Sequence, residues 1–162
     1  MDITSIRLRA GWVYLVAVLD WYSRSVVAWA RGQTLALGFV LEAMAGALSR
    51  ATPEICNSEQ GGHFTSPQYR GLLTSAAVPI SMDGRGRALD NVFTERLWRS
   101  VKYEEVYSKD YASPKEARRG PERYFAYYNH ERPHRALSYQ TPAEVYADKR
   151  QALVAAGDDE RS

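Results

Sequence analysis

The chain has 162 residues, of which 45% are hydrophobic and 25% are charged, and its net charge is +2. This size suits one domain with a real core, and the composition is ordinary for a soluble globular protein. No apolar run approaches the ~20 residues that span a bilayer, and a single cysteine excludes an internal disulfide. The first residues do not resemble a signal peptide, so we expect a cytoplasmic protein with no membrane partner.

The opening of the chain predicts a β-meander. Residues 2–9, 11–20 and 25–32 are rich in β-branched and aromatic side chains, and turn-forming residues separate them. The second segment is almost continuously apolar, which indicates a strand covered on both faces. From residue 35 to 50 the apolar side chains recur at helical spacing, so this segment is expected to be an amphipathic helix.

The remaining elements alternate between short strands and helices. A proline that directly follows a serine or threonine favours the first turn of a helix. Short strands are expected at residues 54–56 and 78–80, and helices at residues 66–75, 88–106 and 113–128 and from residue 141. This order of elements predicts an α/β fold in which helices are layered on a sheet and the chain ends in helices.

Three acidic residues stand out by their local context. Asp2 begins the first predicted strand, Glu59 follows a short strand within ICNSEQGGHFTS, and Glu95 lies inside the long helix. The expected buried stripe of that helix recurs every four residues, at Leu89, Phe93, Leu97 and Val101. Glu95 shares another face of the helix with Asn91, Arg99 and Lys102. The residues alone leave two interpretations of this face: a solvated surface with a Glu95–Arg99 ion pair, or a metal-binding carboxylate with cations beside it that contact phosphates.

Several motifs together resemble the integrase-like catalytic core of bacterial insertion-sequence transposases. They are DIT at the first strand, NSEQGGHFTS after the short strand, LDNVFTERLWRSVKYEE on the helix, and YYNHERPHRAL followed by YQTPAEVY near the end. The resemblance implies an RNase H-like fold, a mixed sheet flanked by helices. It places the core at residues 1–110, a helical C-terminal extension at 111–150 and a disordered tail at 151–162.

The resemblance also implies a triad of two aspartates and a glutamate that holds two Mg²⁺ ions, or Mn²⁺ as a substitute, for DNA cleavage and strand transfer. Asp2 matches the first aspartate and Glu95 matches the glutamate. Glu59 stands where the family has its second aspartate, and the 35-residue interval to Glu95 is kept. The extra methylene moves the ligating oxygens by roughly an ångström, which can cost about a hundredfold in rate. We therefore expect impaired catalysis.

Basic residues are the expected DNA contacts. Residues 1–84 balance six basic against six acidic side chains, whereas residues 85–150 carry fourteen basic against ten acidic. Four side chains are expected to contact phosphates: Arg85, Arg87, Arg99 and Lys102. For the loop that holds the first two, an ordinary surface loop is the open alternative. The resemblance implies transposon ends and target DNA as partners, with a homo-oligomer assembled on the DNA.

The start of the chain departs from the family pattern. In the family a strand continues upstream of the first aspartate and a helix-turn-helix region precedes it, whereas here Asp2 is the second residue. We therefore expect a core that is truncated at its N-terminus. Two other functions stay open: a catalytically inactive remnant that binds DNA or a full-length transposase, and a general RNase H-like nuclease, which the closing motifs disfavour.

Two further groups of residues have open or structural interpretations. The tryptophans at positions 12, 21, 29 and 98 are expected to be core or half-buried packing residues. The segment NHERPHRAL at residues 129–137 is either a phosphate-contacting patch or an exposed turn fixed by Pro133. The side chains concerned are His130, Arg132, His134 and Arg135.

Overall fold

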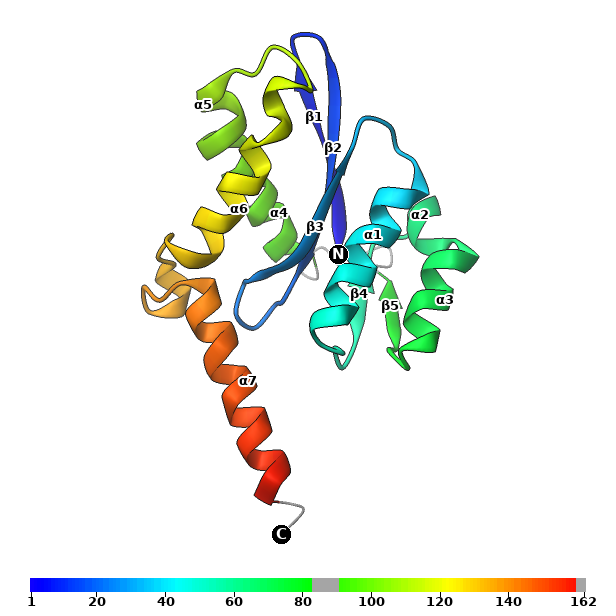
Figure 1. The fold of residues 1–162 in the computed structure, drawn as a ribbon, viewed down its shortest axis with the longest axis vertical. Coiled ribbons are helices and arrows are strands. Elements are labelled where there is room, and N and C mark those ends of the chain that lie inside the picture. The colour runs from blue at the N-terminus through cyan, green and yellow to red at the C-terminus, as the bar shows by residue number, and fades with distance from the viewer. Residues whose placement is uncertain (83–90, 160–162) are drawn as a thin grey trace.

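Figure 1 shows the computed structural model of the protein, which describes residues 1–82 and 91–159. Strands and helices are mixed along the chain, which confirms the predicted α/β class. The strands are β1 (Asp2–Leu8), β2 (Gly11–Leu19), β3 (Val26–Gly32), β4 (Cys56–Ser58) and β5 (Ile80–Met82). The α-helices are α1 (Leu37–Arg50), α2 (Gly62–Thr65), α3 (Pro67–Ser75), α4 (Val92–Ser100), α5 (Tyr107–Lys109), α6 (Gly120–His130) and α7 (Pro142–Asp159). Shorter elements are the π-helix η1 (Val101–Val106) and the 3-10 helices η2 (Glu116–Arg118) and η3 (Arg135–Leu137).

The first three strands form the predicted antiparallel meander. They pair in the order β1-β2-β3, and Leu8 lies opposite Gly11 at the turn between the first two. Gly11 has a φ of 104°, a backbone conformation that favours glycine, so this residue allows the tight turn. The two short strands β4 and β5 pair with each other in parallel. All predicted strands are therefore present, in two hydrogen-bonded groups.

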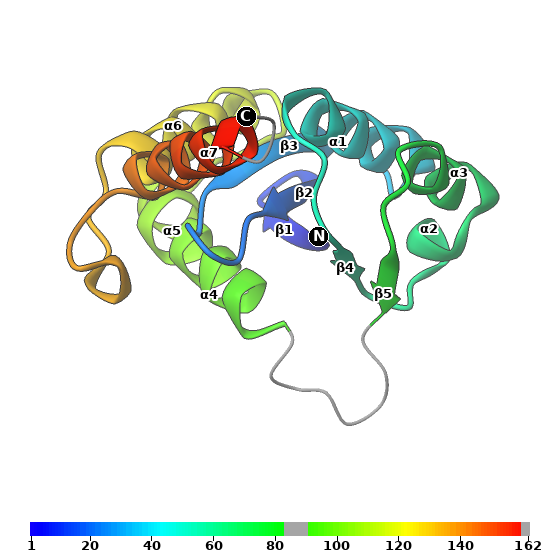
Figure 2. The same ribbon diagram turned by 90° about the horizontal axis from the view of Figure 1, so that it is seen from below.

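Helices cover both faces of the meander. Side chains alternate along β2, so that Leu15 faces a core cluster with α4, η1 and α6, whereas Val16 faces a second cluster with α1, α2 and α3. Both side chains are fully buried, which confirms the prediction of a strand covered on two faces. Figure 2 shows this layering, with α4 and α6 on one side of the meander and α1 and α3 on the other.

The long helix predicted before residue 106 is present from Val92 as α4, and it continues through η1 into α5. Leu97 and Val101 of its predicted apolar stripe are buried, and Phe93 packs half-buried at the margin of the same cluster. The fourth member of the stripe, Leu89, lies outside the described residues. The apolar spacing therefore predicted which side of this helix faces the sheet. None of the helices that the structure describes is long and apolar enough to cross a membrane.

The tryptophans divide between the core and the surface. Trp98 is buried, and Trp21 and Trp29 are half-buried against the core, as expected. The expectation is wrong for Trp12, which is 45% exposed. Trp12 is the second residue of β2, beside the turn, and its ring is contacted by the guanidinium of Arg7 at 5.8 Å.

Helix α6 binds the start of β3 through one side chain. The Asn129 Oδ1 atom accepts a hydrogen bond from the Val26 N–H, and its Nδ2 donates to the Val26 carbonyl, both at 2.9 Å. Phe125 and Tyr128 of the same helix lie in the core cluster of the meander. Helix α6, part of the predicted C-terminal extension, therefore packs on the same core as the strands. The division of the chain at residue 110 stays a prediction.

The segment NHERPHRAL is only in part the exposed patch or turn that its composition suggests. Arg132 donates to Glu104 of η1 with two nitrogens, Nε at 3.0 Å and NH2 at 2.6 Å from its carboxylate oxygens. The ring of His134 is half-buried and packs edge-on against Tyr128, and burial lowers the pKa of His134. Arg132 and His134 therefore hold the segment to the core, while His130 and Arg135 are exposed.

The ion pair of Glu104 and Arg132 predicts a pH-dependent contribution to stability. Burial opposes the charged form of Glu104, but hydrogen bonds from Arg132 and Tyr124 outweigh it and lower the pKa of this carboxyl. A folded pKa below the unfolded value stabilises the fold above about pH 5, and the contribution is lost as the pH falls through the folded pKa. Both side chains are about one-third exposed or less, at 35% and 27%.

We therefore expect Glu104→Gln to lower the free energy of unfolding by roughly 1 kcal/mol at pH 7, because solvent screens the pair. The difference from the parent protein should shrink as the pH falls through the lowered pKa of Glu104, because the protonated carboxyl and its replacement are both neutral. Urea unfolding at a series of pH values measures this. Glu131→Gln, an exposed position on the same segment, is the control. A difference that stays constant from pH 7 to pH 3 would contradict the role of the Glu104 charge.

The last part of the chain that the structure describes is helical. Helix α7 runs from Pro142 to Asp159, so residues 151–159 are helical, with side chains 151–157 exposed. The helix starts with a reciprocal cap: the Thr141 N–H donates to the Glu144 carboxylate at 2.7 Å, and the Glu144 N–H donates to the Thr141 hydroxyl at 3.4 Å. Alanine, leucine and glutamine beyond it favour the helix. The expectation of a disordered tail at residues 151–162 stays a prediction.

Candidate active site

The strands and the helix that carry the three selected acids meet at one place. The amino nitrogen of Met1 donates to the Asn57 carbonyl at 2.7 Å, which joins the start of β1 to β4. The indole Nε1 of Trp98 donates to Asp2 Oδ2 at 3.0 Å, which joins β1 to α4. Each of these contacts links residues more than 50 positions apart in the chain. The fold therefore brings β1, β4 and α4 together although the sequence separates them.

Asp2 has a fixed orientation. The residue is 5% exposed, and it is the first residue of β1. One carboxylate oxygen accepts the Ile3 N–H at 2.7 Å, and the other accepts the Trp98 indole N–H. Because both oxygens have a donor, the side chain is held by the strand on one side and by α4 on the other. Trp98 lies three residues beyond Glu95. Helix α4 therefore carries both Glu95 and the residue that orients Asp2.

Glu59 and Glu95 have exposed side chains, and Asn91 is hydrogen-bonded to both residues. Glu59 follows β4, and its Oε1 accepts a hydrogen bond from Asn91 Nδ2 at 3.3 Å. Asn91 directly precedes α4, and its carbonyl accepts the Glu95 N–H at 3.0 Å in the first turn of that helix. The contact therefore ties the segment after β4 to the start of the helix on which Glu95 lies.

Sequence reasoning did not assign a site role to either Asn91 or Trp98. In the sequence, Asn91 falls on the polar face of the helix, and Trp98 is expected to be a packing residue. The available signal was helical spacing, since Asn91 lies four residues before Glu95 and Trp98 three residues after it. Asn91 contacts Glu59 and Trp98 contacts Asp2 only in the tertiary fold, which helical spacing does not predict.

The three acidic side chains are of a chemical type that binds divalent cations. Carboxylate oxygens are the ligands that Mg²⁺ prefers in proteins. Within residues 1–82 and 91–159, however, no three His, Cys, Asp or Glu side chains lie close enough to hold one ion together. Carboxylates repel one another, so their approach requires a cation between them. Asp2 is already oriented, whereas Glu59 and Glu95 are exposed side chains that rotamer changes can move.

The basic residues predicted to contact DNA are only partly described. Arg99 is exposed on α4, and Lys102 is half-buried on η1, one turn further along the same helix. Arg85 and Arg87 lie outside the described residues. His63 Nε2 lies 2.6 Å from the Leu35 carbonyl, a contact to the backbone before α1.

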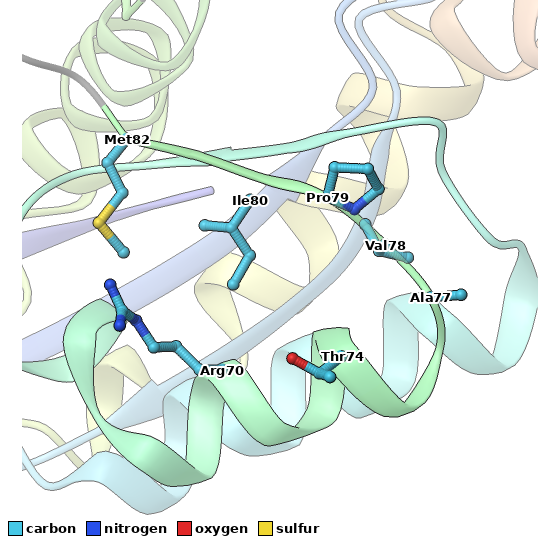
Figure 3. Close-up of a pocket in the computed structure, with 7 residues that line it drawn as sticks. All are labelled: Arg70, Thr74, Ala77, Val78, Pro79, Ile80 and Met82. Carbon is cyan, nitrogen blue, oxygen red and sulfur yellow. The ribbon is translucent and has the colours of Figure 1, made fainter.

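The grooves that the structure describes lie away from the three acids. Figure 3 shows one of about 630 Å³, between α3 and β5, in which Arg70 reaches toward Met82. Another, of about 400 Å³, is lined by β3, α1 and α6. Neither of these two grooves is lined by Asp2, Glu59 or Glu95.

Known structures share this fold. The catalytic core of BIV integrase matches with a TM-score of 0.68 at 14% identity, covering 94% of this chain and 96% of that one. The HTLV-2 integrase core, solved with magnesium as a dimer, matches with a TM-score of 0.70 at 16% identity, covering 89% of this chain and 90% of that one. A chain of the simian T-cell lymphotropic virus intasome matches with a TM-score of 0.74 at 16% identity, covering 89% of this chain and 51% of that one. These likenesses confirm the predicted RNase H-like fold.

Sequence comparisons identify the family. Two family profiles described as integrase core domain match residues 1–88 and 76–142. The transposase of element IS904 from Lactococcus lactis is 27% identical over 147 residues, 88% of this chain and 58% of that protein. Transposase InsF of element IS3A from Escherichia coli is 30% identical over 115 residues, 69% of this chain and 40% of that protein. The chain thus spans about half the length of these relatives. It belongs to the integrase core domain family and has the integrase-like core of an insertion-sequence transposase.

Proposed function

We propose that this chain cleaves transposon ends and joins them to target DNA by metal-dependent phosphoryl transfer. The observation that supports this most directly is the pair of contacts Asp2–Trp98 and Glu59–Asn91, which bring all three family-matched acids to one helix. Membership of the integrase core domain family, whose profile matches residues 1–88, supports the reaction class. We further propose that the protein acts as a homo-oligomer on DNA in the cytoplasm. The HTLV-2 integrase core has been solved in dimeric and trimeric forms.

In this proposal Asp2, Glu59 and Glu95 hold two Mg²⁺ ions, for which Mn²⁺ can substitute. When bound, such ions activate the attacking oxygen and stabilise the leaving oxygen of an in-line displacement. Asp2 contributes a ligand that the strand and Trp98 have already oriented, which reduces the entropy lost when the site assembles. Glu59 and Glu95 complete the set from the segment after β4 and from α4.

Arg99 and Lys102 are proposed to contact phosphates next to these carboxylates. Both lie on the helix that carries Glu95, four and seven residues beyond it. Positions with these spacings fall on one side of a helix, so a phosphate backbone that meets the cations also passes the acid. Arg85 and Arg87 keep the same proposed role, outside the described residues.

Glu59 is proposed to impair the reaction, because a glutamate reaches about one methylene further than the aspartate of the family pattern. Glu59→Asp should therefore raise the rate of strand transfer with Mg²⁺ by about a hundredfold. The assay uses duplexes that carry the DNA flanking the gene, and it measures donor cleavage and strand transfer with Mg²⁺ and with Mn²⁺. Glu54→Asp, at an exposed position ahead of β4, is the matched control and should change nothing.

The outcomes separate the two candidate functions. Full activity of the parent chain with Mg²⁺ would contradict the impairment by Glu59 while supporting the reaction. No turnover by the Glu59→Asp variant with either ion, together with tight DNA binding, would instead favour a catalytically inactive core that binds DNA or a full-length transposase. The glutamate at this position is the observation that favours that second function.

A further inference from the structure

The helix that carries Glu95 continues as an exposed ridge of one basic and two aromatic side chains. Arg99, Tyr103 and Tyr107 follow one another at intervals of four residues. Tyr103 is 64% exposed and Tyr107 is 60% exposed, and their rings meet edge to face with centroids 5.4 Å apart. The Arg99 guanidinium lies 5.7 Å from the Tyr103 ring. The two rings therefore form an exposed aromatic pair, whose faces and edges can be contacted by a ligand.

The π-helix η1 keeps these side chains on one side of the helix. The Tyr107 N–H donates to the Lys102 carbonyl, a bond that spans five residues where an α-helix spans four. An α-helix has about 3.6 residues per turn, so residues four apart drift around its axis. The wider turn of η1 offsets that drift. The ridge therefore runs along the helix from α4 to α5.

The charges around the ridge suit an anionic ligand. Of the two acids in η1, Glu104 is bound by Arg132, and Glu105 is 8% exposed and accepts the Tyr111 hydroxyl. The charge of Glu104 is therefore offset by the Arg132 guanidinium, and the Glu105 side chain is turned into the protein, away from the surface of the ridge. Three cations of α4 and η1 lie exposed or half-buried on this helix: Arg96, Arg99 and Lys102. The combination of cations and exposed rings is typical of surfaces that bind nucleic acid strands.

We propose that the ridge of Arg99, Tyr103 and Tyr107 binds unpaired DNA, with nucleobases stacked on the tyrosine rings and Arg99 against a phosphate. This inference deepens the proposed function and rests on it for the identity of the ligand as DNA. Inside a duplex the base faces are covered by their neighbours, whereas unpaired bases offer them for stacking. The ridge starts four residues beyond Glu95, so a strand bound there leads to the candidate active site.

Fluorescence anisotropy with labelled oligonucleotides of about 20 nucleotides tests this, using the same sequence as a single strand and as a duplex. The buffer contains EDTA, so that binding is measured without turnover. The double variant Tyr103→Ala/Tyr107→Ala is expected to weaken single-strand binding about tenfold or more and duplex binding less than about threefold. The pair Tyr103→Phe/Tyr107→Phe keeps both rings and should bind like the parent protein.

Tyr139→Ala is the matched control, because this tyrosine is 69% exposed on a different segment, and both affinities should stay unchanged. Equal weakening of single-strand and duplex binding by the alanine pair would overturn the proposal, as would a change below about twofold in single-strand affinity. A parent protein that does not bind the single strand would also overturn it. Because no metal is present, a failure of catalysis by Asp2, Glu59 and Glu95 does not affect these measurements.

Discussion

Asp2→Asn is expected to lower the rate of strand transfer by at least about a thousandfold. Asparagine keeps the size of the side chain but replaces one ligating oxygen with an NH₂ group, which cannot bind a cation. Metal ions supply several kcal/mol of transition-state stabilisation in phosphoryl transfer, and roughly 4 kcal/mol corresponds to about a thousandfold in rate. The comparison is made in the Glu59→Asp background, where the expected activity is high enough to measure such a loss.

Two further variants define the cause of that loss. Asp148→Asn changes an exposed aspartate of α7 and should leave the rate unchanged. Trp98→Phe keeps a buried ring but removes the N–H that Asp2 Oδ2 accepts, so a smaller loss of about tenfold is expected. Stabilisation by Mn²⁺ in thermal unfolding gives a readout besides activity and should disappear in Asp2→Asn. An Asp2→Asn variant within tenfold of its parent would contradict the role of this carboxylate.

Asn129→Ala is expected to lower the free energy of unfolding by about 2–4 kcal/mol. The substitution leaves the N–H and the carbonyl of Val26 without their hydrogen-bond partner, and each unsatisfied buried group costs about 1–3 kcal/mol. Val26 is 2% exposed, so water does not replace the amide without rearrangement. For a domain of this size the melting temperature should fall by roughly 5–15 °C. Thermal and urea unfolding measure the change.

Neighbouring substitutions provide the comparison. His130→Ala removes an exposed side chain next to Asn129 on the same helix and should change stability by less than about 0.5 kcal/mol. Asn129→Asp keeps an acceptor for the Val26 N–H but loses the donor for its carbonyl, so an intermediate loss is expected. If Asn129→Ala were as stable as His130→Ala, the two hydrogen bonds would not matter for the fold.

The sequence predicted most of the secondary structure because periodicity is a local property. The β-branched segments at residues 2–32 and the apolar spacing of α1 and α4 each fix their element within one short window. Beyond residue 150 two local signals point in different directions. The acidic end DDERS suggests a frayed tail, whereas the helix propensity of residues 151–156 and the cap at Thr141 favour α7.

The candidate site could be predicted only through its family resemblance. That resemblance selects Asp2, Glu59 and Glu95, whose joint role stays a prediction. Nothing local predicts that Trp98 orients Asp2, because the two residues are 96 positions apart. The same holds for Arg132, which looks like a phosphate contact in the sequence but binds Glu104, 28 positions away. Both assignments require a tertiary contact that single-sequence reasoning does not contain.

The hydrogen bonds of Asn129 also affect how copies of this protein can associate. β3 is the last strand of its sheet, and an unpaired strand edge is a template for pairing with a second chain. At Val26 the amide of Asn129 satisfies the backbone donor and acceptor together, as a neighbouring strand would. A second copy therefore cannot extend the sheet there without displacing α6. Protection against edge-to-edge aggregation is thus built into a residue of the family's closing motif.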